Sequence, residues 1–408
     1  MASATSGILS GVRVVELASW TFVPAAGAVL ADWGAEVLKI EHPAGGDPQR
    51  GLVSSGVVAG STSGINHMIE QPNRGKRSVA LDVRHPEGRE LLYRLIESAD
   101  VFLTNWLLEP CRRAGFDVDS IRARNPSIVY ARGSGQGSRG PDANRGGFDL
   151  ASYWARGGIG DAYFPGPGDY PPLQRPAFGD IMGGLAIAAG IAGALFRRER
   201  TGEPSIVDVS LLGTAVWNLA PDVVVSGLLG GPAPKFDLAE MPNPLANFYR
   251  TADGRFLAFV LLQSDRHWPA FCAAIERLDL RDDVRFASAA ARSENRRVCI
   301  EELRKVFATR TLAQWKLRLA ALEGVWAPVQ SAHELHQDEQ VLANGYLPEL
   351  SAENGARFRL AANPVQFDET PPSLRRAPGI GEDTDAVLLE LGFEIERILE
   401  LKASGVLL

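Results

Sequence analysis

Asp180 is the residue best placed to act as a nucleophile. It follows Phe178 and Gly179 and precedes an apolar segment rich in glycine and alanine, which is the position and residue type of a helix N-cap. The positive end of a helix favours an ionised carboxylate, and Gly183 and Gly184 would leave room for a bulky ligand. An ionised, accessible carboxylate can attack a thioester. The alternative interpretation is that Asp180 only caps the helix.

Two turns could meet an anionic ligand. The segment 133–137 (GSGQG) offers backbone N–H groups, including a possible oxyanion site, but it lacks the spacing of a dinucleotide or Walker loop. The segment 73–77 (NRGKR) is a compact basic turn that would either hold phosphates or be solvated surface. His333 and His336 have no third ligand nearby, so we interpret them as surface residues rather than a metal site.

The composition limits the classes of protein to be considered. The chain has 408 residues, of which 45% are hydrophobic and 22% are charged, and its net charge is −7. These values predict a folded protein of two domains or one large α/β unit, and exclude a disordered chain. The negative charge gives no support for binding to nucleic acid or to an anionic membrane, so an anionic ligand would need a local basic pocket.

Three features indicate where the protein works. Cys111, Cys272 and Cys299 are widely spaced and odd in number, which argues against a disulfide framework or a cysteine zinc site. The first six residues lack the basic and apolar regions of a signal peptide. The longest apolar stretch, residues 183–196, is too short to span a bilayer. We therefore expect a soluble, cytoplasmic protein.

The elements that would position these residues alternate along the chain. Strands are predicted at 12–17, 36–40, 78–82, 101–103 and 128–131, and helices at 24–33, 86–96 and 181–198, after which the segments 207–210 and 211–217 continue the fold. This alternation predicts a mostly parallel sheet covered on both faces, with ligands beyond the carboxyl ends of its strands. Residues 132–179 are irregular and glycine-rich, but their aromatic side chains favour a functional segment. We expect Trp20, Trp33 and Trp106 to lie in the core.

The second half of the chain has a different pattern. A proline-rich stretch at 232–244 predicts a domain boundary, and a hairpin is expected to turn at Asp253-Gly254. Residues 271–342 are predicted to be mainly helical, 364–378 extended, and 385–391 a closing helix.

A set of short motifs runs through nearly the whole chain. They are the segments 11–17 (GVRVVEL), 30–41 (LADWGAEVLKIE) and 73–82 (NRGKRSVALD), the Gly179-Asp180 pair, 249–254 (YRTADG) and 381–385 (GEDTD). In type and order they resemble the family III CoA-transferases, also called the CaiB/BaiF family, of which formyl-CoA transferase is the best-known type.

The resemblance implies a fold and a chemistry. The fold would be α/β, with a Rossmann-like large domain built from both chain ends, a smaller middle domain, and two subunits interlocked as a homodimer. The domains would comprise residues 1–230, 231–340 and 341–408, the last returning to the large domain. Asp180 would attack an acyl-CoA thioester, giving a mixed anhydride and then an aspartyl-CoA thioester from which a carboxylic acid collects CoA. No metal or redox cofactor would be needed, since coenzyme A is part of the substrate.

The resemblance also implies which residues meet coenzyme A. They are Thr21, Phe22, His42, Leu81, Asp82, Val83, Arg84, Asn105, Trp106, Arg113, Phe148 and Asp149. His42 departs from the arginine often found there, and a lysine of formyl-CoA transferase is replaced, with Arg145 adjacent. We therefore do not expect formate or oxalate as the acid. If Phe22, Phe148 and Tyr153 frame the acyl site, larger apolar acids would be favoured.

Three other functions remain to be compared. α-Methylacyl-CoA racemases belong to the same family, but Phe148 and Asn247 stand where racemases carry their histidine and glutamate, and racemisation needs such an acid–base pair. A non-catalytic acyl-CoA-binding protein would not need Asp180. A nicotinamide oxidoreductase would need a G-x-G-x-x-G turn near the first strand, where residues 19–21 are SWT.

Overall fold

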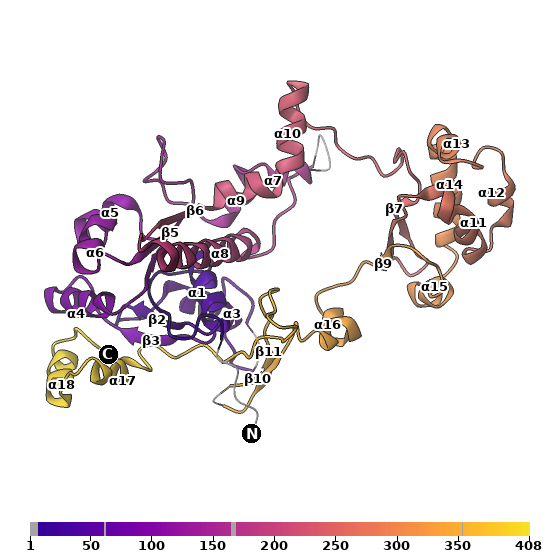
Figure 1. Ribbon diagram of the computed structural model, residues 1–408. Coiled ribbons are helices and arrows are strands. Elements are labelled where there is room, and N and C mark those ends of the chain that lie inside the picture. The colour runs from indigo at the N-terminus through magenta and orange to yellow at the C-terminus, as the bar shows by residue number, and fades with distance from the viewer. Residues whose placement is uncertain (1–6, 61–62, 165–168, 353) are drawn as a thin grey trace. The chain divides into compact units, whose positions relative to one another are not determined.

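The chain folds into two compact units in a computed structural model that describes residues 7–60, 63–164, 169–352 and 354–408 (Figure 1). One unit comprises Met1–Gly231 with Glu339–Leu408, and the other comprises Pro232–Asp338. The residues that could carry chemistry belong to the first unit.

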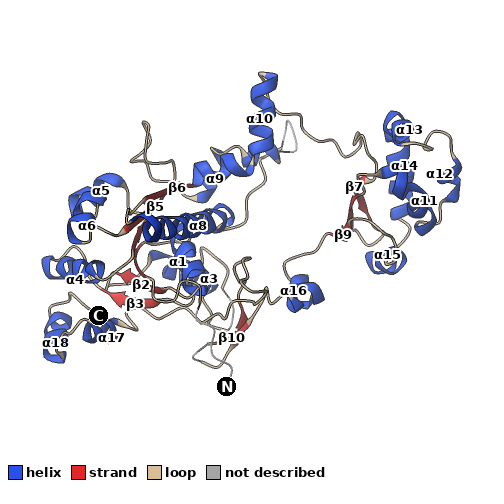
Figure 2. Ribbon diagram, viewed as in Figure 1, coloured by secondary structure: helices blue, strands red, loops and turns tan. Residues whose placement is uncertain are grey.

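A six-stranded parallel sheet forms the centre of the first unit (Figure 2). Its strands lie in the order β3-β2-β1-β4-β5-β6, with bounds Arg77–Ala80, Glu36–Glu41, Arg13–Leu17, Val101–Thr104, Val129–Ser134 and Ile206–Ser210. Val15 of β1 lies opposite Leu38 on one side and Phe102 on the other. Because neighbouring strands are parallel, their carboxyl ends meet at one edge, where ligands bind in sheets of this kind. The five predicted strands are confirmed with ends that differ by at most three residues, the largest difference being at the end of β5.

Helices cover both faces of this sheet and form a hydrophobic core on each face. Successive residues of β1 point alternately into these two cores. Val14 packs against α1 (Phe22–Asp32) and α8 (Phe178–Thr201). Val15 faces the opposite core, formed with α4 (Pro86–Glu97), α6 (Val118–Arg124), α17 (Thr384–Glu390) and α18 (Ile395–Ala403). This period of two is what a strand buried on both faces requires. The C-terminal helices thus complete the core of the first unit.

Shorter elements fill the rest of the first unit. They are η1 (Pro48–Arg50), α2 (Gly51–Ser54), α3 (His67–Asn73), α5 (Leu108–Ala114), the π-helical turn η2 (Leu150–Ala155), α7 (Ile159–Ala162), α9 (Leu211–Asn218), α10 (Ala220–Leu229), α16 (Glu339–Ala343), and the antiparallel pair β10 (Glu349–Ser351) and β11 (Arg357–Arg359). The expected irregular segment 132–179 therefore contains the end of β5, η2, α7 and the start of α8. Its residues 165–168 lie outside the described part.

Helix α8 corrects three expectations. It begins at Phe178 with Ala177 as the cap residue, so Asp180 lies in the first turn and is not the N-cap. A Cβ on Gly183 would lie 2.4 Å from the Phe22 ring, and one on Gly184 would lie 2.7 Å from the Ala25 Cβ. These glycines therefore allow α1 and α8 to pack closely, and do not leave room for a ligand. With 24 residues, α8 is also longer than the expected apolar stretch.

Length and composition alone would allow α8 to cross a membrane, and the bent pair α9–α10 passes the same test. In this fold, however, Ile187 and Ile191 of α8 are fully buried against α1 and the sheet. These are the contacts of a helix that packs in the core of the first unit.

The second unit is a small α/β domain with an aromatic core. Strands β7 (Ala246–Arg250), β8 (Phe256–Val260) and β9 (Trp326–Pro328) form an antiparallel sheet. The expected hairpin is confirmed, with Gly254 at φ +77°. Its helices are α11 (Ser264–Ala274), α12 (Leu278–Asp282), α13 (Ala289–Glu294), α14 (Arg296–Phe307), α15 (Leu312–Leu319) and η3 (Glu334–Gln337). In the core of this unit the buried ring of Phe307 contacts the rings of Tyr249 and Trp315, which are also buried.

Candidate active site

A cavity of about 270 Å³ opens at the carboxyl ends of β1, β2 and β3. Five of the residues expected to meet coenzyme A line it together: His42, Leu81, Val83, Arg84 and Trp106. The walls are completed by Leu17, Ala18, Ser19, Ile40, Glu41, Gly46, Asp47 and Pro48. The cavity therefore combines apolar walls with a few polar groups, as small-molecule sites commonly do.

Charged side chains gather at the mouth of this cavity. Arg84 is 70% exposed, and its Nε lies 3.1 Å from Asp82 Oδ1. The Nε2 of His42 lies 3.6 Å from Asp82 Oδ2 and also contacts the Arg84 guanidinium. Partial burial alone would raise the pKa of Asp82, but hydrogen bonds from Arg84 lower it below its ordinary value. An exposed guanidinium at this edge offers an anionic ligand a charge-assisted contact.

The turn between β1 and α1 forms one wall of the cavity. The side chain of Asn105 holds it by accepting from the Ser19 N–H at 3.2 Å and donating to the Ser19 carbonyl at 2.7 Å. The Thr21 hydroxyl is buried and donates to Gln49 Oε1 at 2.9 Å. Thr21 and Asn105 thus support the turn and are not among the residues that line the cavity.

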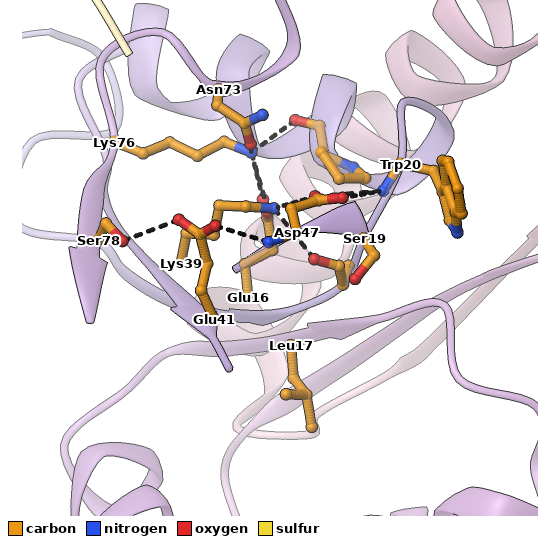
Figure 3. Close-up of polar contacts among 12 residues, drawn as sticks. Glu16, Leu17, Ser19, Trp20, Lys39, Glu41, Asp47, Asn73, Lys76 and Ser78 are labelled. Atoms are coloured by element: carbon orange, nitrogen blue, oxygen red, sulfur yellow. Dashed lines mark hydrogen bonds and ion pairs between the residues drawn. The ribbon is translucent and has the colours of Figure 1, made fainter. Parts of the chain in front are cut away.

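Beneath the turn lies a buried ion cluster made of Glu16, Lys39, Asp47 and Lys76 (Figure 3). The Nζ of Lys39 lies 2.9 Å from Asp47 Oδ2 and 3.3 Å from Glu16 Oε1. The Nζ of Lys76 contacts Glu16 Oε2 at 2.7 Å. Burial lowers the pKa of Lys76, while the charge on Glu16 opposes that change. Each buried charge therefore has an opposite charge within hydrogen-bonding or ion-pair distance.

Burial and ion pairs correct both interpretations of the basic turn at 73–77. Arg74 and Lys76 are buried rather than solvated, and Arg74 pairs with Asp32 at 2.7 Å. Arg77 pairs with Glu36 and Glu390. Because carboxylates already neutralise these side chains, the turn neither holds phosphates nor forms a free basic surface.

Asp180 and Asp149 form a carboxylate pair at the starts of α8 and η2. Both are half-buried, and no ion pair joins either of them to a basic side chain in the described part of the chain. Burial, followed by the charge on Asp149, raises the pKa of Asp180 to about 8. Burial also raises the pKa of Asp149, although the Leu150 N–H donates to its Oδ1 at 2.8 Å. The expectation that the helix end keeps Asp180 ionised is therefore wrong near neutral pH.

An aromatic pair, exposed Phe148 and half-buried Trp20, lies next to these carboxylates. Phe148, the residue before Asp149, is 60% exposed and meets the Trp20 ring edge-on at 5.4 Å. Phe22 and Tyr153, which were expected to join Phe148, are instead buried in the core. Trp20 was expected in the core and is only half-buried. Its place directly after the first strand, where dinucleotide-binding turns carry glycine, was the signal that could have identified it.

Several other expected groups lie elsewhere. Arg113 is exposed at the end of α5 and does not line the cavity. The Gly137 N–H donates to Ser134 Oγ at 3.0 Å, so it is already used and is a poor oxyanion donor. Asn247 belongs to the second unit and is buried, where its amide donates to the Leu238 carbonyl. Among the described residues, no cluster of His, Cys, Asp or Glu could hold a metal, and this includes His333 and His336.

Comparison with known proteins places this geometry in a family. The family model described as CoA-transferase family III matches residues 9–384. The (R)-2-hydroxy-4-methylpentanoate CoA-transferase of Clostridioides difficile is 32% identical, over 98% of this chain and 99% of that protein. The cinnamoyl-CoA:phenyllactate CoA-transferase of Clostridium sporogenes is also 32% identical, over 97% and 96%. A CaiB/BaiF family crystal structure from Brucella suis superposes with a TM-score of 0.81 at 28% identity, covering 95% of this chain and 100% of that one. The chain therefore belongs to CoA-transferase family III, and the resemblance found in its motifs is confirmed.

Proposed function

We propose that this enzyme moves CoA from an acyl-CoA donor to a carboxylic acid acceptor, with Asp180 as the nucleophile. The observation that carries the proposal is a half-buried carboxylate in the first turn of α8 that has no basic partner among the residues the structure describes. A carboxylate that a neighbouring cation does not neutralise keeps its lone pairs available for attack.

The exchange balances without a redox or metal cofactor. An Asp180 oxygen attacks the thioester carbonyl, the C–S bond breaks, and CoA leaves as a thiolate, forming a mixed anhydride. The thiolate then attacks the aspartyl carbonyl, which releases the donor acid and forms an aspartyl-CoA thioester. The acceptor carboxylate attacks this thioester to give a second anhydride and free thiolate. Attack of the thiolate on the acceptor's acyl carbon forms the new acyl-CoA and restores Asp180.

The carboxylate pair supports this chemistry through its electrostatics. Burial and the charge on Asp149 disfavour the ionised form of Asp180, which is why its pKa rises to about 8. Formation of the anhydride removes the negative charge from Asp180. It therefore relieves both the desolvation of that charge and its repulsion by Asp149, so the site favours acylation once the carboxylate has ionised.

The cavity supports a place for the CoA nucleotide. We propose that Leu81, Val83 and Trp106 contact its adenine and ribose, while His42, Asp82 and Arg84 meet its polar and phosphate groups at the mouth. Thr21 and Asn105 act indirectly, through the turn that forms the cavity wall. Phe148 and Asp149 lie on the thioester side, next to Asp180.

We further propose that the active form is an obligate, interlocked homodimer. Large apolar side chains are exposed on α9 and α10, including Trp217 at 79% and Leu228 at 82%, and such surfaces usually mark an interface. The enzyme is inferred to be cytoplasmic, because Cys111, Cys272 and Cys299 are buried free thiols. Sedimentation at low protein concentration tests the assembly, and a folded, active monomer would contradict it.

No observation favours the racemase alternative. The two positions that racemases would use hold Phe148 and Asn247, which cannot exchange an α-proton. A racemase would exchange that proton with deuterated water, whereas a transferase of this design would not.

The decisive experiment is covalent trapping at Asp180. Incubation with an acyl-CoA followed by hydroxylamine should modify a peptide containing Asp180, seen by mass spectrometry. Asp180→Ala should retain CoA binding and lose transfer by at least about 10³-fold. Asp119→Ala is the matched control, because Asp119 is an exposed acidic residue in the first turn of α6. Transfer by Asp180→Ala at the wild-type rate would show that the residue is only structural.

A further inference from the structure

The turn between β1 and α1 holds a tryptophan in a costly backbone conformation. Trp20 has φ +70°, a left-handed value that bulky residues rarely adopt. Such conformations persist only where the surrounding structure enforces them, and they cluster at functional sites. The structure must therefore contain groups that fix Trp20.

The buried ion cluster supplies those groups. The Trp20 N–H donates to both carboxylate oxygens of Asp47, at 3.1 and 3.2 Å. Lys39 fixes Asp47 at 2.9 Å and also donates to the Ala18 carbonyl at 3.0 Å, so it holds the turn on the other side of Trp20. Asp47 and Lys39 are both buried, which leaves the turn little freedom to relax.

The enforced conformation directs the indole outward. Figure 3 shows the Trp20 ring pointing away from Lys39 and Asp47. On that side the ring meets Phe148 edge-on, at 5.4 Å and 89°. Phe148 immediately precedes Asp149, the N-cap of η2, and Tyr153 of η2 packs against the start of α8 at Phe178. The aromatic pair thus lies beside the helix start that carries Asp180.

We propose that Trp20 and Phe148 form an apolar wall that selects acids with an aryl or bulky branched side chain, and that Asp47 and Lys39 are the positioning residues that hold Trp20 in this wall. The inference rests on the proposed function, because it assigns the acid class accepted at the same site. An aryl or branched group that covers the exposed Phe148 ring removes apolar surface from water, whereas acetate offers almost none. Edge-to-face contact with the indole adds to that preference.

The first test is acid selectivity, expressed as the ratio of kcat/KM for 3-phenylpropanoate to kcat/KM for acetate. Trp20→Ala and Phe148→Ala should each lower this ratio by about 10- to 100-fold, since most of the lost contact is made only by the aryl group. A general loss of folded enzyme would lower both rates equally and leave the ratio unchanged. An unchanged selectivity ratio in both variants would overturn the proposal that Trp20 and Phe148 form a selective apolar wall.

The second test separates positioning from stability. Asp47→Asn keeps an oxygen that can accept the Trp20 N–H and should retain most of the selectivity, whereas Asp47→Ala should lower the ratio by about tenfold. Asp117→Ala is the matched control, because Asp117 also accepts two backbone N–H groups, at the start of α6, and lies outside the cavity. It should reduce thermal stability without changing the ratio.

The third test uses non-additivity. Trp20→Gly removes the indole and accepts a positive φ without strain, so adding Asp47→Ala should cause no further loss of selectivity. A full additional tenfold loss in this double variant would show that Asp47 acts elsewhere. If Asp47→Ala does not fold, the comparison of Asp47→Asn with Trp20→Gly still decides the question. Asp47→Asn should keep a higher selectivity ratio than Trp20→Gly, and equal ratios would overturn the positioning role of Asp47.

Failure of this inference is distinguishable from failure of the proposed function. If the wild-type enzyme transfers CoA and Asp180→Ala does not, the function stands whatever the selectivity ratios show. If the wild type transfers CoA but prefers acetate to 3-phenylpropanoate, the proposal of an apolar wall is wrong, whereas the proposal that Asp180 is the nucleophile still stands.

Discussion

The buried ion cluster and the carboxylate pair both place charge inside the first unit, but they do so in opposite ways. In the cluster, Glu16 lies between Lys39 and Lys76, and all three side chains are fully buried. In the pair, Asp180 and Asp149 carry the same charge, and neither has a basic partner in the described part of the chain. Opposite charges in close contact fix a structure, whereas like charges raise a pKa and store repulsion that a reaction can release.

The stabilising role of the ion cluster can be tested by removing the charge of Glu16. Glu16→Gln keeps the size of the side chain but leaves two buried ammonium groups without their shared carboxylate. Loss of one partner from a buried ion pair costs about 3–5 kcal/mol, so we expect a decrease of that order in the free energy of unfolding, measured in urea.

The control for this change is Glu36→Gln. Glu36 also lies between two basic residues, Arg13 and Arg77, but its side chain is 31% exposed. Exposed pairs contribute about 1 kcal/mol or less, and the control should lose no more than that. Equal losses for the two variants would mean that burial does not distinguish the cluster from surface pairs.

Removal of a charge from the carboxylate pair should stabilise the protein, whereas removal of a charge from the ion cluster should destabilise it. Because folding raises the pKa of Asp180 to about 8, the folded state holds this proton more tightly than the unfolded chain does. The resulting stabilisation is complete at acidic pH and is lost as pH rises toward 8. Asp180→Asn has no charge to bury, so its advantage in stability should grow between pH 5 and 9, by at least about 1–2 kcal/mol after allowance for solvent screening of the half-buried side chain. A thermal unfolding series across this range measures it, and a constant difference would contradict the raised pKa.

A test of catalysis replaces Asp149 of the carboxylate pair and leaves the proposed nucleophile Asp180 unchanged. Transfer requires ionised Asp180, so kcat/KM for the wild type should rise with pH and level off above about 8. Asp149→Asn removes the repulsion but not the burial of Asp180, which is the larger cause of its raised pKa. We expect the rising limb of the pH profile to move to lower pH by roughly one unit. A limb that does not move would show that Asp149 is not charged in the free enzyme.

The strands and the family could be read from the sequence because their signals are local. Val14 and Val15 alternate between two cores, and such β-branched runs mark strands buried on both faces. The ion cluster is not local, since Glu16 reaches Lys39 and Lys76 across 23 and 60 residues. A usable hint was present, because Glu16 and Lys39 stand in otherwise apolar strands and become direct cross-strand neighbours.

Asp180 shows a different limit of sequence reasoning. Its place near a helix start was predicted, and the helix dipole suggested an ionised group. Burial and Asp149 outweigh that effect, and both depend on how η2 packs against α8. The same packing buries Tyr153 and leaves Phe148 exposed, although the two aromatic residues look alike in the sequence.

The smallest effect is expected at the cavity mouth, where charge is neither buried nor isolated. Arg84 is 70% exposed, so Arg84→Ala should change the free energy of unfolding by less than about 0.5 kcal/mol. It should nevertheless raise the KM of the acyl-CoA donor by about 3- to 10-fold, through loss of a charge-assisted contact, and this increase should shrink at high salt. Arg113→Ala is the matched control, because Arg113 is exposed but does not line the cavity. If Arg113→Ala raises the KM and Arg84→Ala does not, the contact with coenzyme A implied by the family resemblance lies at Arg113, and the cavity mouth does not bind the nucleotide.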